Sequence, residues 1–247
     1  MSHSGTSPAL VFVHGLLGFD QIRLWPRPIS YFRHLRETVA GRGLTAYFTS
    51  LPPVGTVAGR AAALDASLQE IPDQRLCLVA HSMGGLDSRY LIQHHDSDRR
   101  VGTLVTIGTP HRGTYLAKWL LEGHGLMPWL VRPWTRMALA ELTPEACSRF
   151  NEAVPDRDDV RYLSFAGARP EGEMPRGFRP WTRMLTREAG ENDSQVPVSS
   201  ARWGEFRGIQ RADHLELVGW SLAPADEQRQ RPFDDRALFE AILDDLM

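Results

Sequence analysis

A serine stands where a short apolar run of the chain changes into a helical pattern. The segment RLCLVAHSMGG spans residues 75–85, and its apolar residues 76–80 predict a strand that is buried on both faces. After Ser82, apolar residues recur at helical spacing as far as residue 93. A serine on a tight strand-to-helix turn between small residues is typical of a nucleophile elbow, although Ala80 replaces the first glycine of the usual G-x-S-x-G pattern. We therefore expect Ser82 to be a nucleophile, the alternative being a serine that caps a helix.

A serine hydroxyl is a weak nucleophile near neutral pH, so it needs a histidine to accept its proton and a carboxylate to orient that histidine. On an elbow of this kind the acid and then the histidine follow the serine along the chain. Asp193 lies in GENDSQ, whose composition predicts a loop after a strand, and His214 opens the pattern HLELV. Asp213 is the alternative acid, although adjacent residues do not readily bring their side chains together. The sequence predicts a triad of Ser82, Asp193 and His214.

The oxyanion of a tetrahedral intermediate needs two hydrogen-bond donors. The backbone N–H of Met83 lies in the first turn of the predicted helix, where such groups have no partner inside the helix. The second donor is expected from the loop HGLLG, which follows the apolar strand 9–13. We choose the N–H of Leu16 for this role, with Leu17 as the alternative.

Strands and helices alternate around these loops. The predicted strands cover residues 9–13, 44–49, 75–80, 101–107 and 161–166, and the predicted helices cover 31–39, 57–71, 83–93 and 233–247. This alternation predicts a single α/β domain over residues 1–247, with a mostly parallel sheet and helices on both faces. The loops that carry the expected site residues then meet at the carboxyl ends of the strands. Residues 167–180, rich in proline, glycine and charge, are expected to form a surface loop.

The segment from Tyr115 to Leu142 differs from this alternating pattern. Tryptophan and leucine are concentrated there, and glycine and proline divide it into short pieces. Because it lies between two predicted strands, we interpret residues 114–142 as a lid or cap inserted over the site. The residues expected to contact substrate or form the lid are Leu17, Trp119, Leu120, Trp129 and Trp134. The alternative is that this segment forms ordinary core helices.

The composition fits a globular protein of one core, with 247 residues, 42% hydrophobic and 23% charged. A formal net charge of −2 gives no reason to expect a nucleic-acid partner. We expect no export signal and no transmembrane segment, and hence a cytoplasmic protein, because the first apolar run is only five residues long. Cys77 and Cys147 show no spacing typical of a disulfide framework or a metal site.

Several motifs together carry a resemblance to a known family. The segments VFVHGLLGFD, AHSMGG, TIGTPHRGT, LTPEACSRFNEAVP, RYLSFAG, ENDSQVPVSSARWG and DHLELV occur in this order. In this order they resemble the bacterial true lipases of the Pseudomonas and Burkholderia type. The resemblance covers most of the chain and implies an α/β-hydrolase fold with an inserted helical lid. It also implies the triad and the oxyanion donors chosen above.

The sequence departs from this family at identifiable positions. Met83 stands where the family usually has a histidine, and Ser199 where a disulfide cysteine is expected. The family also binds a structural calcium ion near its catalytic histidine. Glu216 matches one ligand position by type, whereas Glu171 or Glu173 would be only a loose match for the other. We expect no required cofactor, with Glu216 as the candidate ligand if calcium is bound.

The leading hypothesis is a serine carboxylic-ester hydrolase, a lipase or esterase, that acts on acyl esters with apolar chains. The expected cap supplies an apolar lining, and the expected partners are a small ester or lipid substrate and a transient lipid interface. An acyltransferase or thioesterase could use the same triad, because these enzymes share the acyl-enzyme and differ in the acceptor. A non-catalytic binding module on the same fold is a further alternative, but such proteins usually lack a member of the triad.

Overall fold

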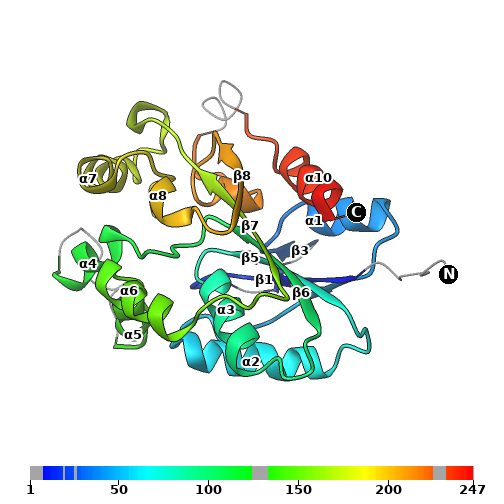
Figure 1. The fold of residues 1–247 in the computed structure, drawn as a ribbon. Helices are drawn as coiled ribbons and strands as arrows, with labels where there is room; N and C mark the ends of the chain where they lie inside the picture. The colour runs from blue at the N-terminus through cyan, green and yellow to red at the C-terminus, as the bar shows by residue number, and fades with distance from the viewer. Residues whose placement is uncertain (1–7, 19, 25–26, 124–132, 225–231, 247) are drawn as a thin grey trace.

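Six parallel strands form the central sheet of the molecule (Figure 1). The computed structural model describes residues 8–18, 20–24, 27–123, 133–224 and 232–246. The strands run in the order β4-β1-β5-β6-β7-β8 across the sheet. Their bounds are Ala9–Val13 for β1, Ala46–Phe48 for β4, Leu76–His81 for β5, Val101–Ile107 for β6, Arg161–Gly167 for β7 and Glu205–Gln210 for β8. The predicted parallel α/β sheet is confirmed.

Helices cover both faces of this sheet (Figure 1). On one face lie α1 and α10, which span Leu35–Gly41 and Asp235–Leu246, and on the other lie α2 and α3, which span Val57–Gln69 and Gly84–His94. Each central strand contributes alternate side chains to two separate cores, one under each pair of helices. This explains why β1 and β5 are apolar at nearly every position, as expected of strands without a solvent-facing side.

Three short helices lie together beside α3, of which the first two fall within residues 114–142, the segment that we expected to form a cap, and the third follows that segment. They are α4, α5 and α6, which span Tyr115–Leu121, Pro133–Glu141 and Pro144–Ala153. Threonine side chains fix two of their starting points, because Thr114 accepts a hydrogen bond from the N–H of Leu116, and Thr143 from that of Ala146. Their inner sides pack against Met83 and other residues of a third apolar cluster.

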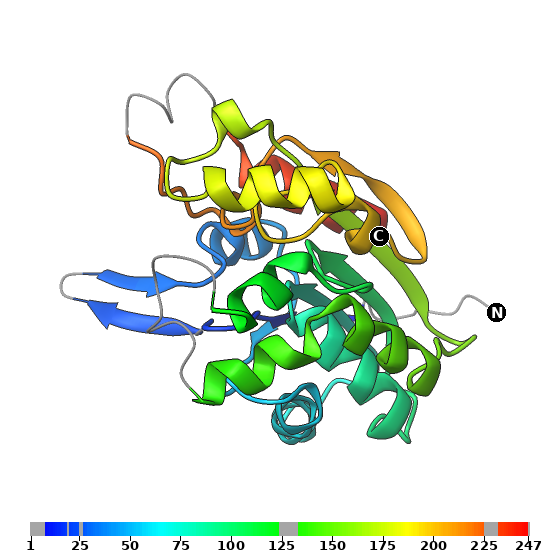
Figure 2. The ribbon, with the colours of Figure 1, turned by 90° about the vertical axis from the view of Figure 1, so that its left-hand side faces the viewer.

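The remaining elements surround the carboxyl ends of the strands. The helix α7 spans Arg179–Ala189, α8 spans Val198–Ala201, and the short 3₁₀ helices η2 and η3 span Glu171–Glu173 and Glu216–Val218. A hairpin of β2 (Gln21–Leu24) and β3 (Arg27–Ser30) projects from the body of the molecule (Figure 2). None of the described helices is long and apolar enough to cross a membrane.

Some predicted boundaries and elements were wrong. The hairpin, β8 and α7 were not predicted, and the first helix begins at Leu35 rather than at residue 31. The expected surface loop 167–180 is in part buried, since Arg169 is only 6% exposed and Met174 is fully buried. For the missed elements and for the buried part of this loop, contacts with distant segments decide the local structure. Such contacts leave no periodic signal in the sequence.

Candidate active site

Ser82 occupies a strained turn between β5 and α3. Its φ angle is +55°, in the left-handed region that residues with a Cβ rarely adopt. Hydrogen bonds fix the turn, since the Ser82 N–H donates to the Ile107 carbonyl at 3.0 Å and its carbonyl accepts from Thr109 Oγ1 at 2.8 Å. A Cβ on Gly84 would lie 2.8 Å from the His14 carbonyl oxygen, which explains why a glycine follows the serine so closely.

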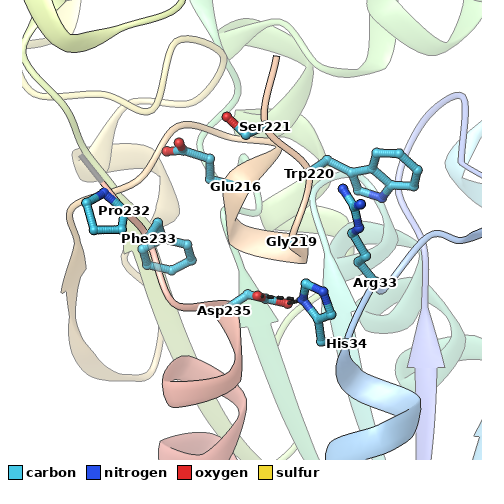
Figure 3. A pocket seen from close by; sticks show the side chains of 9 residues that line it. All are labelled: Arg33, His34, Glu216, Gly219, Trp220, Ser221, Pro232, Phe233 and Asp235. Atoms are coloured by element: carbon cyan, nitrogen blue, oxygen red, sulfur yellow. Dashed lines mark hydrogen bonds and ion pairs between the residues drawn. The ribbon is translucent and has the colours of Figure 1, made fainter. Parts of the chain in front are cut away.

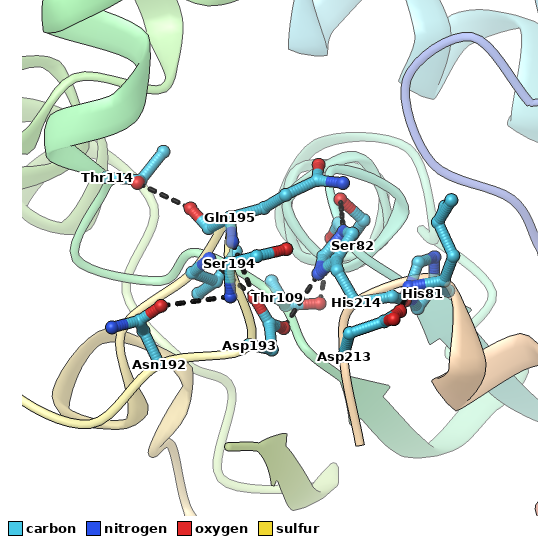
Figure 4. A network of polar contacts seen from close by, with 12 residues as sticks. His81, Ser82, Thr109, Thr114, Asn192, Asp193, Ser194, Gln195, Asp213 and His214 are labelled. Atoms are coloured by element: carbon cyan, nitrogen blue, oxygen red, sulfur yellow. Dashed lines mark hydrogen bonds and ion pairs between the residues drawn. The ribbon is translucent and has the colours of Figure 1, made fainter. Parts of the chain in front are cut away.

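The three predicted triad residues lie in one hydrogen-bonded chain (Figure 4). His214 Nε2 lies 2.9 Å from Ser82 Oγ, and His214 Nδ1 lies 2.7 Å from Asp193 Oδ2. The other oxygen of Asp193 accepts from the backbone N–H groups of Gln195 and Val196 at 2.9 and 2.7 Å. With Asp193 as the acceptor at Nδ1, Nε2 is free to accept the serine proton. The geometry is that of an activated nucleophile.

The loops that carry the acid and the histidine differ from the sequence expectation in detail. Asp193 follows the helix α7 rather than a strand, and His214 precedes the short helix η3 rather than a longer one. The alternative acid, Asp213, does not contact the imidazole of His214. Its Oδ1 instead accepts from the N–H groups of Leu215 and Glu216, at 2.9 and 3.0 Å. Asp213 therefore caps the turn that carries the histidine.

Two backbone N–H groups beside Ser82 have no hydrogen-bond partner among the described residues. They belong to Leu16 and Met83, the two expected oxyanion donors. The N–H of Leu17, the alternative donor, is already bonded to the Pro53 carbonyl oxygen at 2.6 Å. A Cβ on Gly15 would lie 2.7 Å from the Ser82 Cβ, so this loop is in close contact with the nucleophile. The geometry thus favours Leu16 over Leu17.

A buried ion pair orients the peptide between Gly15 and Leu16. The Gly15 carbonyl oxygen accepts from His14 Nδ1 at 2.9 Å and from Arg60 Nη2 at 3.3 Å. Arg60 Nε in turn donates to Asp87 Oδ2 at 2.8 Å, and both side chains are fully buried. Because the C=O and N–H of a trans peptide point in opposite directions, holding this carbonyl on one side directs the Leu16 N–H to the other. Sequence analysis missed Arg60, which looks like an ordinary helix residue.

A second set of contacts connects the oxyanion loop with the histidine loop. The Gly15 N–H donates to the Tyr31 hydroxyl oxygen at 3.3 Å, and that oxygen lies 2.7 Å from His81 Nδ1. His81 Nε2 lies 3.1 Å from the His214 carbonyl oxygen, so the His81 ring faces the histidine loop from behind. Burial of the His81 ring is the main reason why its pKa lies well below the usual range, and electrostatic repulsion from the nearby His214 ring lowers this pKa further. His81 is therefore neutral, and its two ring nitrogens connect the Tyr31 hydroxyl to the His214 carbonyl oxygen.

The expected lid residues fall into two groups. Trp119 and Leu120 are half-buried on α4, and Leu120 packs against the cluster that contains Met83. Trp134 and Leu17 are exposed, at 57% and 51%, as is the nearby Met137 at 55%. Trp129 lies outside the described residues, as do residues 124–132 in general.

Calcium does not fit the residues around Glu216. Calcium prefers six to eight oxygen ligands. Both carboxylate oxygens of Glu216 are already 3.0 Å from Arg169 Nη1, and one of them also accepts from the Asp213 N–H at 2.9 Å. Within the described ranges, no three or more His, Cys, Asp or Glu side chains are grouped so that they could hold a metal ion. The candidate calcium ligand is therefore bound to a guanidinium.

A separate pocket lies behind the histidine turn, between α1, η3 and α10 (Figure 3). Its volume is about 340 Å³, and in its wall His34 Nδ1 lies 2.9 Å from Asp235 Oδ1. Glu216 lines this pocket, but Ser82 and His214 do not. The pocket is thus distinct from the place where a substrate would meet the nucleophile.

Comparison with known proteins gives a consistent result. Residues 62–179 match the family model of the PGAP1-like alpha/beta domain. Triacylglycerol lipase 2 of Saccharomyces cerevisiae is 30% identical over 88% of this chain and 82% of its own length. A triacylglycerol lipase of Pseudomonas fragi is 23% identical over 91% of this chain and 92% of its own length. Among solved structures, mature Bacillus licheniformis lipase BlEst2 superimposes with a TM-score of 0.75 over 98% of this chain and 92% of that one, at 24% identity. A metagenomic carboxyl esterase superimposes with a TM-score of 0.78 over 98% of this chain and 76% of that one, at 21% identity.

Proposed function

The chain belongs to the α/β-hydrolase lipase superfamily and is a carboxylic-ester hydrolase, and we propose that it cleaves acyl esters with apolar chains through Ser82, His214 and Asp193. The observation that carries this proposal is the hydrogen-bonded chain from the Ser82 hydroxyl to the Asp193 carboxylate. The serine is held on a strained turn, and beside it lie two N–H groups that no described residue accepts from. Together these are the parts needed for acyl transfer.

The geometry supports a two-step mechanism. Ser82 Oγ attacks the ester carbonyl carbon while His214 Nε2 accepts the hydroxyl proton. The N–H groups of Leu16 and Met83 stabilise the oxyanion, and the Asp193 carboxylate stabilises the imidazolium that forms. His214 then donates its proton to the departing alcohol oxygen, which leaves an acyl group on Ser82. A water molecule, deprotonated by His214, hydrolyses this acyl-enzyme and releases the carboxylic acid.

The apolar surroundings of Ser82 support an acyl rather than a charged substrate. Met83, Leu16 and Leu120 belong to one cluster, which continues through the inner sides of α4 and α5. The relatives are named triacylglycerol lipases, and we extend that substrate class to this chain as part of the proposal. The narrower assignment to the bacterial true lipases is also a proposal. The order of the motifs and the likeness to the Pseudomonas fragi enzyme support it.

We further propose that α4 and α5 form part of a lid that contacts a lipid surface. Their inner sides are apolar and buried, yet α5 also exposes Trp134 and Met137. Exposed apolar groups of this size beside a site often mark a surface for a lipid or another apolar partner. Trp134→Ala should therefore slow the hydrolysis of aggregated long-chain esters while leaving soluble acetate esters unaffected.

The direct test is a series of p-nitrophenyl esters from acetate to palmitate, assayed with the wild type and Ser82→Ala. Loss of the nucleophile should lower kcat by at least about 1000-fold for every ester. Ser88→Ala is the matched control, because Ser88 is a buried serine of α3, the helix that follows Ser82, and donates to the Gly84 carbonyl oxygen at 2.7 Å. A Ser82→Ala variant that keeps more than about a tenth of the wild-type kcat would exclude the mechanism. Product analysis with added alcohols or thiols distinguishes hydrolysis from acyl transfer.

A further inference from the structure

A buried cluster of one arginine and two carboxylates lies beside the histidine loop. Arg169 Nη1 is 3.0 Å from both oxygens of Glu216, and Arg169 Nη2 donates to the Arg211 carbonyl oxygen at 2.7 Å. Asp213 completes the cluster from the same turn. The side chains of Arg169 and Glu216 are 4% and 7% exposed. Burying a guanidinium without a partner costs folding free energy, so the carboxylate and the carbonyl oxygen that Arg169 binds are needed for it to be buried here.

We propose that Arg169 is a positioning residue whose guanidinium takes the place of a structural cation and fastens the histidine loop to the end of β7, where the backbone of the same residue holds the acid loop. Its guanidinium binds a carboxylate and a backbone carbonyl, which are the kinds of oxygen ligand that a calcium ion would take. The proposal rests on the triad proposed above, because the two loops matter for activity only if Asp193 and His214 act together.

On the histidine side, Arg169 acts on a closed turn. Asp213 Oδ1 accepts from the Glu216 N–H, and a Glu216 oxygen accepts from the Asp213 N–H, so the two side chains form a reciprocal capping box. His214 lies inside this box, directly after Asp213. By binding Glu216 and the Arg211 carbonyl, Arg169 contacts the chain on both sides of His214. The backbone of the histidine therefore has little freedom to move.

On the acid side, the contact is made by the backbone of Arg169. Its N–H donates to the Asn192 carbonyl oxygen at 3.2 Å, one residue before Asp193. The His214 N–H in turn donates to the Asp193 carbonyl oxygen at 2.8 Å. Arg169 follows the carboxyl end of β7, which is paired with β6 and β8 on its two sides, so both loops are attached to a rigid support. One residue thus links three segments that are far apart in the sequence.

The first consequence is that the enzyme should not depend on calcium. Removal of divalent ions with EDTA should change neither kcat nor the melting temperature, and added millimolar CaCl₂ should not raise the melting temperature, because a ligand that binds only the folded state would do so. A melting temperature that falls in EDTA and recovers with CaCl₂ would overturn the proposal. The melting temperature is measured without any assay of activity, so this readout is independent of the proposed triad.

The second consequence concerns the geometry of the triad. Arg169→Met should lower kcat for soluble p-nitrophenyl butyrate roughly 10- to 100-fold with little change in KM, because misplacement of a catalytic group affects the transition state most. Arg169→Lys should recover only part of this loss, since an ammonium lacks the planar fork. The low-field proton resonance of His214 Nδ1–H should weaken in Arg169→Met, which a role in stability alone would not cause.

Arg183→Met is the matched control, because Arg183 lies on α7 and forms an exposed ion pair with Glu171 of η2. It should keep kcat within about twofold of the wild type. If Arg169→Met does not fold, Glu216→Gln provides the test, since the amide oxygen can still accept from the Asp213 N–H while the charge is lost. A kcat equal to that of the wild type in Arg169→Met or in Glu216→Gln would refute the role of Arg169. A Ser82→Ala variant that retains activity would instead refute the triad.

Discussion

Two buried arginines, Arg60 and Arg169, hold opposite sides of the site around Ser82. Arg60 comes from the first turn of α2 and pairs with Asp87 on α3, and both side chains are fully buried. Arg169 comes from the loop after β7 and pairs with Glu216 in the short η3 turn. Arg60 therefore joins two long helices of the core as well as the oxyanion loop, whereas Arg169 joins loops to the end of one strand.

The two guanidinium groups also differ in how fully they are hydrogen-bonded. In Arg60, Nε donates to Asp87, Nη1 to the Pro52 carbonyl oxygen and Nη2 to the His14 and Gly15 carbonyl oxygens. In Arg169, both Nη atoms have partners but Nε has none among the described residues. The oxyanion loop is therefore held by an ion pair between two core helices, α2 and α3. The histidine loop is held by the contacts of one loop residue, Arg169, with Glu216 and the Arg211 carbonyl oxygen. Substitutions should therefore affect stability most at Arg60 and catalysis most around His214.

The largest expected effect concerns the acid on the histidine side. Asp193→Asn should lower kcat by roughly 10³- to 10⁴-fold, because the amide favours the wrong tautomer of His214. Asp213→Asn should cost less than about 10-fold, because Asp213 caps the turn and does not contact the imidazole. Steady-state hydrolysis of p-nitrophenyl butyrate measures both variants. A greater loss in Asp213→Asn would assign the acid to Asp213.

The second prediction compares the two arginines directly by their effect on folding. Arg60→Met should lower the free energy of unfolding by about 3–5 kcal/mol, because it leaves the Asp87 carboxylate buried without its partner. Arg169→Met should lower it by only about 1–2 kcal/mol, because Glu216 lines a pocket and keeps the Asp213 N–H as a hydrogen-bond donor, so its carboxylate is left less isolated than that of Asp87. Urea unfolding followed by circular dichroism measures both values.

A double variant tests the reason for this difference. In Arg60→Met/Asp87→Leu the buried charge is removed together with its partner, so most of the lost stability should return. The oxyanion loop would still lack its guanidinium donor, and kcat should stay low. If Arg169→Met proved as destabilising as Arg60→Met, the histidine side would be as much a part of the core as the oxyanion side.

The elements that sequence analysis predicted well share a local signal. β1 and β6 have the predicted bounds, and β5 and α3 differ from them by one residue, because short apolar runs and helical spacing are visible within a few residues. The candidate triad could be proposed because the chemistry demands three residue types in a fixed order. The edge strand β8 was missed because its residues are alternately exposed and half-buried, with a glycine inside.

The supports of the site could not be predicted in the same way. Leu16 and Leu17 offer chemically identical N–H groups, and only the position of the Pro53 carbonyl, far along the chain, distinguishes them. Arginine is usually exposed, so nothing in the sequence marks Arg60 or Arg169 as buried. Their burial depends on carboxylates and carbonyls supplied by distant segments, and such pairings follow from tertiary structure alone.

The smallest expected effect is the pH dependence of stability on the histidine side. Burial, and then the nearby Glu216 carboxylate, raise the pKa of Asp213 to about 7, although the Arg169 guanidinium opposes this shift. The unfolded chain has the ordinary value of 3.8. Between these two pH values the folded protein binds the proton more tightly than the unfolded chain. The stability from Asp213 is therefore complete below about pH 4 and is lost as the pH rises through about 7.

Asp213→Asn removes this titration while its side-chain oxygen can still cap the turn. Between pH 5 and pH 8 the wild type should lose roughly 1–3 kcal/mol more unfolding free energy than the variant does. Asp87 has a pKa that burial also raises to about 7, but it is present in both proteins, so its contribution cancels in the comparison. Urea unfolding of both proteins at the two pH values measures the difference. Parallel pH dependences would mean that Asp213 is already ionised at pH 5 in the folded protein. The Arg169 guanidinium would then stabilise the Asp213 carboxylate enough to offset its burial.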